Sequence, residues 1–302
     1  MIVRSIFAAL FALTLGMLPA AAQEKVPVVA TFSILADLVK NVGGDRVTVS
    51  TLVQPNGDAH VYQPSPADAK TVADAKNVFM NGLGLEGWLD RLIKASGTKG
   101  AVVIATKGIK PHEMKEEDGG RSKDQEHRLD PHAWQSIANA KIYTANIRDA
   151  LIAADPAGRK VYEENAADYL RRLTALEKEV KEAVAKIAPA KRRVITTHDA
   201  FGYFAKAYGI EFIAPQGVST ETEASAKDVA KIIRQIKAQK IPAVFIENIS
   251  DPRLMQQIAS ETGAKIGGTV YSDSLSDEKG PASTYIDMMQ HNIRQFSAAL
   301  TS

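Results

Sequence analysis

The feature that most constrains this fold is a stretch of about 32 residues without proline, between Asp155-Pro156 and Pro189. Ala, Glu, Lys, Leu and Arg dominate it, and all five are strong helix formers. Asp155 and Pro156 fit an N-cap followed by proline at the first helical position. A helix over 156–187 is roughly 45 Å long, more than a single small lobe needs. The stretch therefore predicts a strut between two lobes, with a two-helix hairpin inside one domain as the alternative.

Short apolar runs alternate with helical patterns on both sides of this stretch. We predict strands over 28–32, 47–53, 78–80 and 101–105, and again over 193–197, 211–214, 243–247 and 265–270. The predicted helices cover 34–42, 66–75 and 86–95, then 200–208, 226–239, 253–262 and 284–300. Such repetition is typical of parallel sheets with helices on both faces. The fold class is therefore α/β, with two (β/α) lobes that each contain a parallel four-stranded sheet.

The expected domain organisation begins with a leader. Residues 1–22 have a positive charge at Arg4, an apolar stretch too short to span a bilayer, and Ala20-Ala21-Ala22 as a small-residue cleavage pattern. We expect a signal peptide over 1–22, an N-terminal lobe over 23–155, a linking helix over 156–187 and a C-terminal lobe over 188–302. An uncleaved anchor helix is the alternative for the leader.

Two features of the composition limit the function. The chain has no cysteine, which excludes disulfides, thiolate catalysis, iron–sulfur clusters and a lipidated N-terminal cysteine. An exported chain of this kind fits the periplasm of a Gram-negative cell. Its 37 Lys and Arg nearly balance 35 Asp and Glu, so electrostatic binding of nucleic acid is not expected. Any bound metal must be held mainly by imidazole and carboxylate.

Four side chains stand out as candidate metal ligands. His60, His198 and Asp273 each follow a predicted strand, and ligands of open α/β sheets bind beyond the carboxyl ends of strands. His132 follows Pro131, which fixes the backbone ahead of it. Three imidazoles and one carboxylate suit a tetrahedral site for a borderline cation such as Zn²⁺. Taken one at a time, however, each histidine is more often structural, and no short-range spacing connects the four.

Several segments resemble a known family. They are residues 57–68, 130–134, 197–209 (THDAFGYFAKAYG), 215–220 and 271–285. They are similar to the metal-specific solute-binding proteins of ABC importers, the cluster A-I (cluster 9) zinc/manganese family. The resemblance covers nearly the whole chain after the leader. It implies two lobes joined by one long helix, with a divalent metal between them held by His60, His132, His198 and Asp273.

The resemblance also implies a function. We expect a periplasmic high-affinity zinc receptor, not an enzyme, that delivers its ion to an ABC permease of the inner membrane. Manganese members of the family often have Glu as the third ligand, whereas this chain has His198, and imidazole favours Zn²⁺. Zinc members often carry a long His-rich loop. Here the loop over 110–128 is short, with only His112 and His127, so manganese stays open as the alternative.

The remaining polar and aromatic candidates have supporting roles. We expect the 110–128 loop to be solvated. His112 and His127 either capture metal transiently or are ordinary residues of a solvated loop. His291 is expected to be structural. We expect Glu86, Asp130 and Glu247 to accept hydrogen bonds from the N–H groups of ligating imidazoles. The alternative is that they cap helices or form surface ion pairs. Core aromatic residues are Trp88, Trp134, Tyr203 and Tyr285.

Two other function classes are alternatives. A zinc hydrolase lacks support because the chain has no His-Glu-x-x-His or Gly-x-Ser-x-Gly motif. A surface adhesin would need no buried metal site. We expect a monomer that binds no nucleic acid, and the sequence leaves open whether a metallochaperone loads it.

Overall fold

The computed structural model describes residues 24–113 and 129–301, and the predicted signal peptide and His127 lie outside this part of the chain. The N-terminal lobe has a parallel sheet of order β2-β1-β3-β4. Its strands are β1 (Val26–Phe32), β2 (Val47–Val53), β3 (Asn77–Met80) and β4 (Ala101–Ile104). Its helices are α1 (Ser33–Gly43), α2 (Pro66–Asp74), α3 (Leu89–Ser96) and α4 (Ile137–Ala154). Every predicted strand of this lobe is present.

The C-terminal lobe has a second parallel sheet, of order β10-β9-β7-β8. Its strands are β7 (Arg193–Ile195), β8 (Glu211–Ile213), β9 (Ala243–Glu247) and β10 (Lys265–Val270). Its helices are α6 (Gly202–Tyr208), α7 (Ala226–Gln239), α8 (Arg253–Thr262) and α9 (Tyr285–Thr301). In each sheet, the strand that comes first along the chain (β1 or β7) lies between the second and the third, and the fourth lies beside the third. The two lobes therefore share one topology, and both predicted sheets are confirmed.

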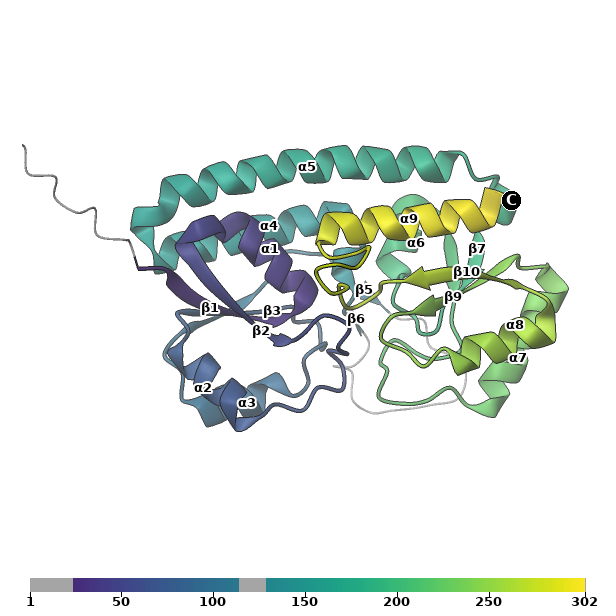
Figure 1. The fold of residues 1–302 in the computed structure, drawn as a ribbon, viewed down its shortest axis with the longest axis horizontal. Helices are drawn as coiled ribbons and strands as arrows, with labels where there is room; N and C mark the ends of the chain where they lie inside the picture. The colour runs from purple at the N-terminus through teal and green to yellow at the C-terminus, as the bar shows by residue number, and fades with distance from the viewer. Residues whose placement is uncertain (1–23, 114–128, 302) are drawn as a thin grey trace, which may run out of the picture.

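Helix α5 (Arg159–Ala185) runs along both lobes (Figure 1). It has 27 residues, and its buried face packs on α1 and α4 at one end and on α9 at the other. A 3₁₀ turn over Pro156–Gly158 precedes it, so the helix is shorter than the predicted 156–187. Asp155 does not cap through its side chain, because its carboxylate accepts hydrogen bonds from Arg46 and Tyr162. The lobe boundaries at 155 and 188 remain a prediction.

The apolar core is continuous across the lobes and the helices that span them. It contains side chains from β1, β3, α1, α4, α5 and α9, together with parts of β7 and β9. A second, smaller cluster lies where α7 and α8 cover the C-terminal sheet; its members are Ile195, Ile232, Ile236, Ile241, Val244, Met255 and Ile258. The four predicted core aromatic residues, Trp88, Trp134, Tyr203 and Tyr285, are all buried. In the described residues, no helix has the length and apolar character required to span a bilayer.

The predicted solvated loop over 110–128 is described only up to Glu113, and its described residues are exposed or half-exposed. Within it the structure adds a short pairing that was not predicted: β5 (His112–Glu113) pairs antiparallel with β6 (Leu129–Asp130). A tertiary hydrogen bond also holds β5: the backbone N–H of His112 donates to the phenolic oxygen of Tyr203 at 2.9 Å. The polar composition of the loop gave no sign of this pairing, because the pairing depends on a residue about 90 positions further along the chain.

Candidate metal centre

The structure brings the four predicted ligands together. His60 lies between β2 and α2, and His132 follows β6. His198 and Asp273 follow β7 and β10, at the carboxyl ends of the C-terminal strands. Each lobe thus supplies two side chains. All four are buried, with His60 exposed by 7% and the other three by 0%.

The donor atoms lie close enough to share one cation. Asp273 Oδ2 is 3.1 Å from Nε2 of His60, 3.1 Å from Nε2 of His198 and 3.5 Å from Nε2 of His132. The Nε2 atoms of His60 and His132 are 3.2 Å apart, and all four donors lie within 4.8 Å of one another. A tetrahedral ion with bonds of about 2.1 Å has donors about 3.4 Å apart. The spacing therefore fits a four-coordinate divalent ion.

Two buried carboxylates orient two of the imidazoles. Asp130 Oδ1 is 2.8 Å from Nδ1 of His132, and Glu247 Oε2 is 2.5 Å from Nδ1 of His198. Glu247 Oε1 also accepts the backbone N–H groups of Thr197 and His198. A proton held on Nδ1 leaves the Nε2 lone pair directed at the cluster, which is the arrangement a metal requires. Asp130 therefore accepts from an imidazole as predicted, and Glu247 lies within ion-pair distance of the other; their role behind a bound metal stays a prediction.

The third predicted acceptor was wrong. Glu86 accepts hydrogen bonds from the Thr31 hydroxyl and from the backbone N–H groups of Asn81 and Gly82. It therefore stabilises a turn of the N-terminal lobe and contacts no imidazole of the cluster within the described residues.

The charges of the cluster are strongly coupled. Burial alone would lower the pKa of His132, but the Asp273 and Asp130 carboxylates outweigh burial and raise it to about 9. Burial has the same effect on His198, and Glu247 and Asp273 raise its pKa well above the usual value. Burial would raise the pKa of Asp273, yet His132 and His198 hold it well below its usual range. The raised pKa values favour the protonated form of both imidazoles at neutral pH, and a divalent cation that displaces two protons leaves the net charge of the cluster unchanged.

One buried atom supports the fit to a cation. Asp273 Oδ1 has no hydrogen-bond partner in the described part of the chain, although the side chain is fully buried. A buried carboxylate oxygen without a partner is costly, and a cation beside it would remove that cost.

Comparisons with known proteins identify the family. Residues 28–299 match the family described as ZnuA, zinc-uptake complex component A, periplasmic. The chain belongs to this family. ZnuA-family proteins are metal-binding substrate-binding proteins of ABC transporters, and the two-lobed fold is the one that the family shares.

Individual relatives carry the names of different metals. The manganese ABC transporter substrate-binding lipoprotein PsaA of Streptococcus anginosus is 32% identical, over 97% of this chain and 95% of its own. The iron-binding protein YfeA of Yersinia pestis is 35% identical, over 91% and 86%. The solved structure of the periplasmic zinc-binding protein TroA of Treponema pallidum matches with a TM-score of 0.83. Its sequence is 29% identical, over 91% of this chain and 99% of its own. Membership of the ZnuA family therefore indicates that the protein binds a metal ion, but it does not identify the metal.

Two predicted core aromatics also join the halves of this ZnuA-family site. Trp134 Nε1 donates to the backbone carbonyl of Ser272, beside Asp273, and Gln135 Nε2 donates to the same oxygen. Tyr285 donates its hydroxyl to the carbonyl of Trp134. The interpretation of these aromatic residues as core was correct but incomplete, because a hydrogen bond between distant segments leaves no local sequence signal.

The other described histidines lie outside the cluster. His112 Nδ1 is 3.6 Å from Asp130 Oδ2, and its ring packs on Tyr203. A Cβ atom at Gly202 would come within 2.6 Å of Asp130 Oδ2, so a larger residue at the start of α6 would force this carboxylate to move. His291 Nε2 lies 2.9 Å from the carbonyl oxygen of Thr269, as expected for a structural residue.

Proposed function

We propose that this protein is a periplasmic receptor that binds Zn²⁺ with high affinity and delivers it to an ABC permease of the inner membrane. The observation that carries the proposal is the buried cluster of His60, His132, His198 and Asp273, to which both lobes contribute. A site divided between two lobes can hold its cargo when the lobes meet and release it when they separate. The ZnuA-family relatives support an ABC permease as the partner.

The donor set favours zinc. Three imidazole nitrogens and one carboxylate oxygen suit a borderline ion, and the four donor atoms lie within 4.8 Å of one another. Four protein donors leave no open position for an activated water, so the site suits storage and release better than hydrolysis. The leader pattern over 1–22 supports the periplasmic location.

Manganese is the second candidate, because relatives such as PsaA carry that metal in their names. The two ions differ in what they require. Mn²⁺ prefers oxygen donors and binds more weakly than Zn²⁺ to most mixed sites. A manganese receptor would therefore gain from a carboxylate where this chain has His198.

A competition titration tests the metal. The purified protein, stripped with a chelator, is titrated with Zn²⁺ and Mn²⁺ in a metal-buffered solution. We expect Zn²⁺ to bind more tightly by roughly a hundredfold or more. Mn²⁺ binding within about tenfold of Zn²⁺ would favour the manganese role, and failure to bind either ion would overturn the proposed function altogether.

A further inference from the structure

A path of hydrogen bonds connects His60 of one lobe to His198 of the other without passing through the metal site. It begins at Asp58, whose Oδ1 accepts the backbone N–H of His60 at 2.9 Å. Its other oxygen, Oδ2, accepts the hydroxyl of Thr220 at 2.6 Å, across 162 residues of sequence. One carboxylate therefore both fixes the backbone of a candidate ligand and contacts the opposite lobe.

The path continues through the C-terminal lobe. Gln216 Nε2 donates to the carbonyl oxygens of Thr220 and Thr222, which fixes the loop that carries Thr220. The backbone N–H of Gln216 donates to the carbonyl oxygen of Thr197, and Gln216 forms an isolated parallel β-bridge with His198. The position of Thr220 is thus tied to the strand end that presents His198.

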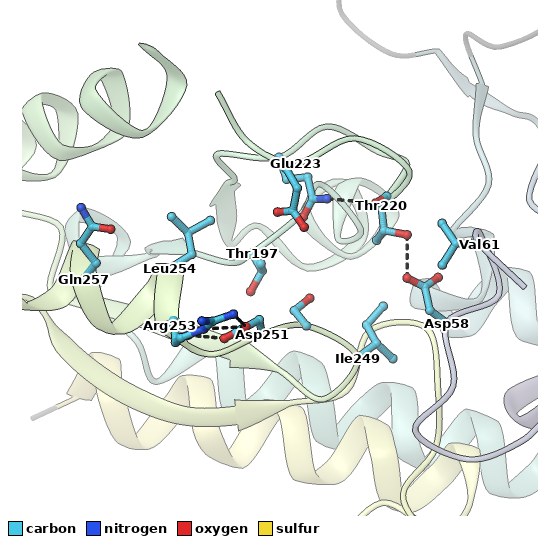
Figure 2. Close-up of a pocket in the computed structure, with 12 residues that line it drawn as sticks. Asp58, Val61, Thr197, Thr220, Glu223, Ile249, Asp251, Arg253, Leu254 and Gln257 are labelled. Atoms are coloured by element: carbon cyan, nitrogen blue, oxygen red, sulfur yellow. Dashed lines mark hydrogen bonds and ion pairs between the residues drawn. The ribbon is translucent and has the colours of Figure 1, made fainter. Parts of the chain in front are cut away.

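This connection lies at an open part of the molecule. Asp58, Val61 and Thr220 line a cavity of about 610 Å³ that the two lobes form together. Figure 2 shows the Asp58–Thr220 hydrogen bond at the edge of this cavity, with Val61 beside it. Asp58 and Thr220 are half-buried, whereas the four cluster side chains are buried. A partner protein could therefore reach this hydrogen bond without reaching the ion.

His60 is the cluster residue most dependent on such support. It lies in a loop rather than at the end of a strand of the C-terminal sheet, and it is the only one of the four with measurable exposure. Among the described residues no carboxylate lies within ion-pair distance of its Nδ1, in contrast to His132 and His198. Asp58 contacts only the backbone N–H of His60, whereas Asp130 contacts both the backbone N–H and the ring of His132.

We propose that Asp58 is the positioning residue for His60, and that its hydrogen bond to Thr220 is a latch that keeps the site closed over the ion. The proposal rests on the proposed function, because it describes how that site retains its cargo. When the latch is formed, His60 and His198 are fixed relative to each other. When the lobes separate, Asp58 loses Thr220, and His60 is the first donor to become free.

The test is the rate at which bound Zn²⁺ is lost to an excess of chelator, measured by stopped flow on the full-length protein. Thr220→Val removes the hydroxyl and keeps the shape, and Thr220→Ser keeps the hydroxyl. We expect T220V to release zinc about tenfold faster than wild type, as for loss of a hydrogen bond to a charged group. T220S should restore the wild-type rate, and the association rate should change little. Ser219→Ala, which removes a neighbouring hydroxyl that contacts Glu221, is the matched control and should have no effect.

The outcomes separate this proposal from the function it rests on. Equal release rates in T220V and wild type, or a T220S protein as fast as T220V, would overturn the latch while leaving the receptor role intact. A wild-type protein that binds no zinc would overturn the receptor role. Thermal unfolding of each metal-free variant shows whether a change in rate arises from loss of fold instead.

Discussion

The two lobes contribute unequal halves to the metal centre. The C-terminal half, His198 and Asp273, follows two strands of one sheet and is wholly buried, with Glu247 against the imidazole. In the N-terminal half, His132 is equally buried and has Asp130 at its ring, but His60 lies in a loop, retains slight exposure and has only a backbone bond to a carboxylate behind it. The difference indicates that His60 is the least firmly held of the four donors, whereas His132, His198 and Asp273 are fixed by the buried side chains around them.

Removing a ligand from each half should give the largest and most unequal effects. Zinc binding to a four-ligand site is worth about 10–16 kcal/mol, or about 3 kcal/mol per ligand, so His198→Ala should weaken binding roughly a hundredfold or more. His60→Ala should cost less, roughly tenfold, because water can reach and replace a ligand that is partly exposed. Chelator-competition titrations measure both. A larger loss in H60A than in H198A would reverse the comparison.

Removing the carboxylates behind the imidazoles should give the next largest effect. Glu247→Gln and Asp130→Asn should each lower zinc affinity by about ten- to a hundredfold, because a neutral amide loses the negative charge that stabilises the ligating imidazole. Gln at position 247 also cannot accept at both of its ends, as Glu247 does. Glu86→Gln is a matched control: Glu86 is equally buried but contacts backbone amides instead. E86Q should lower the melting temperature and leave zinc affinity unchanged. An equal loss of affinity in E86Q and E247Q would show that burial, not contact with a ligand, is what matters.

Proton release should show whether the metal-free cluster carries protonated imidazoles. The pKa of His132 is raised to about 9 and that of His198 is raised well above its usual value, so both imidazoles are protonated at pH 7 in the metal-free protein. Zinc should then displace about two protons, and affinity should rise with pH by about tenfold per unit for each proton displaced. Calorimetry in buffers of different ionisation enthalpy counts these protons. Release of none would contradict the charge balance inferred for the cluster.

The same shift predicts how stability depends on pH. A histidine whose pKa is higher in the folded protein than in the unfolded chain stabilises the fold below its unfolded pKa, near 6.5, and this stabilisation is lost as the pH rises through about 9. The metal-free protein should therefore lose melting temperature between pH 6.5 and 9. The zinc-loaded protein should not, because the ion replaces those protons. Parallel thermal scans of the two forms across this range would detect the difference.

The smallest effect is expected at His112. Its Nδ1 lies 3.6 Å from Asp130 Oδ2, while the other oxygen of Asp130 holds His132 at 2.8 Å. His112→Ala should change zinc affinity by less than about threefold, within the range of a weak surface ion pair. A loss in H112A as large as that in His132→Ala would move the site towards the 110–128 loop.

The parts predictable from the sequence are those with a local pattern. Alternating apolar runs predicted the strands of both sheets, and the rule that ligands bind beyond strand ends indicates His60, His198 and Asp273 from the sequence alone. The helix over 159–185 followed from composition and the absence of proline, but its start did not, because Asp155 is held by Arg46 instead of capping. Residues that act across the lobes had no such pattern.

The Asp58–Thr220 pair and the Trp134–Ser272 pair show why. Each joins side chains or carbonyls more than a hundred residues apart, and their contact depends on how the two lobes meet. Glu86 shows the converse: a buried acid near the site need not serve it, and only its partners reveal that it holds a turn. Local sequence therefore predicted which residues could bind a metal better than it predicted what holds them in place.

The most direct test of the central claim is the X-ray absorption spectrum of the zinc-loaded protein. A shell made entirely by His60, His132, His198 and Asp273 predicts four nitrogen or oxygen neighbours at about 2.0 Å, with the outer-shell scattering of three imidazoles. The spectrum of H198A should then show two imidazoles. A wild-type spectrum with fewer than three imidazoles, or with five or six neighbours that include water, would contradict a cation enclosed by these four side chains.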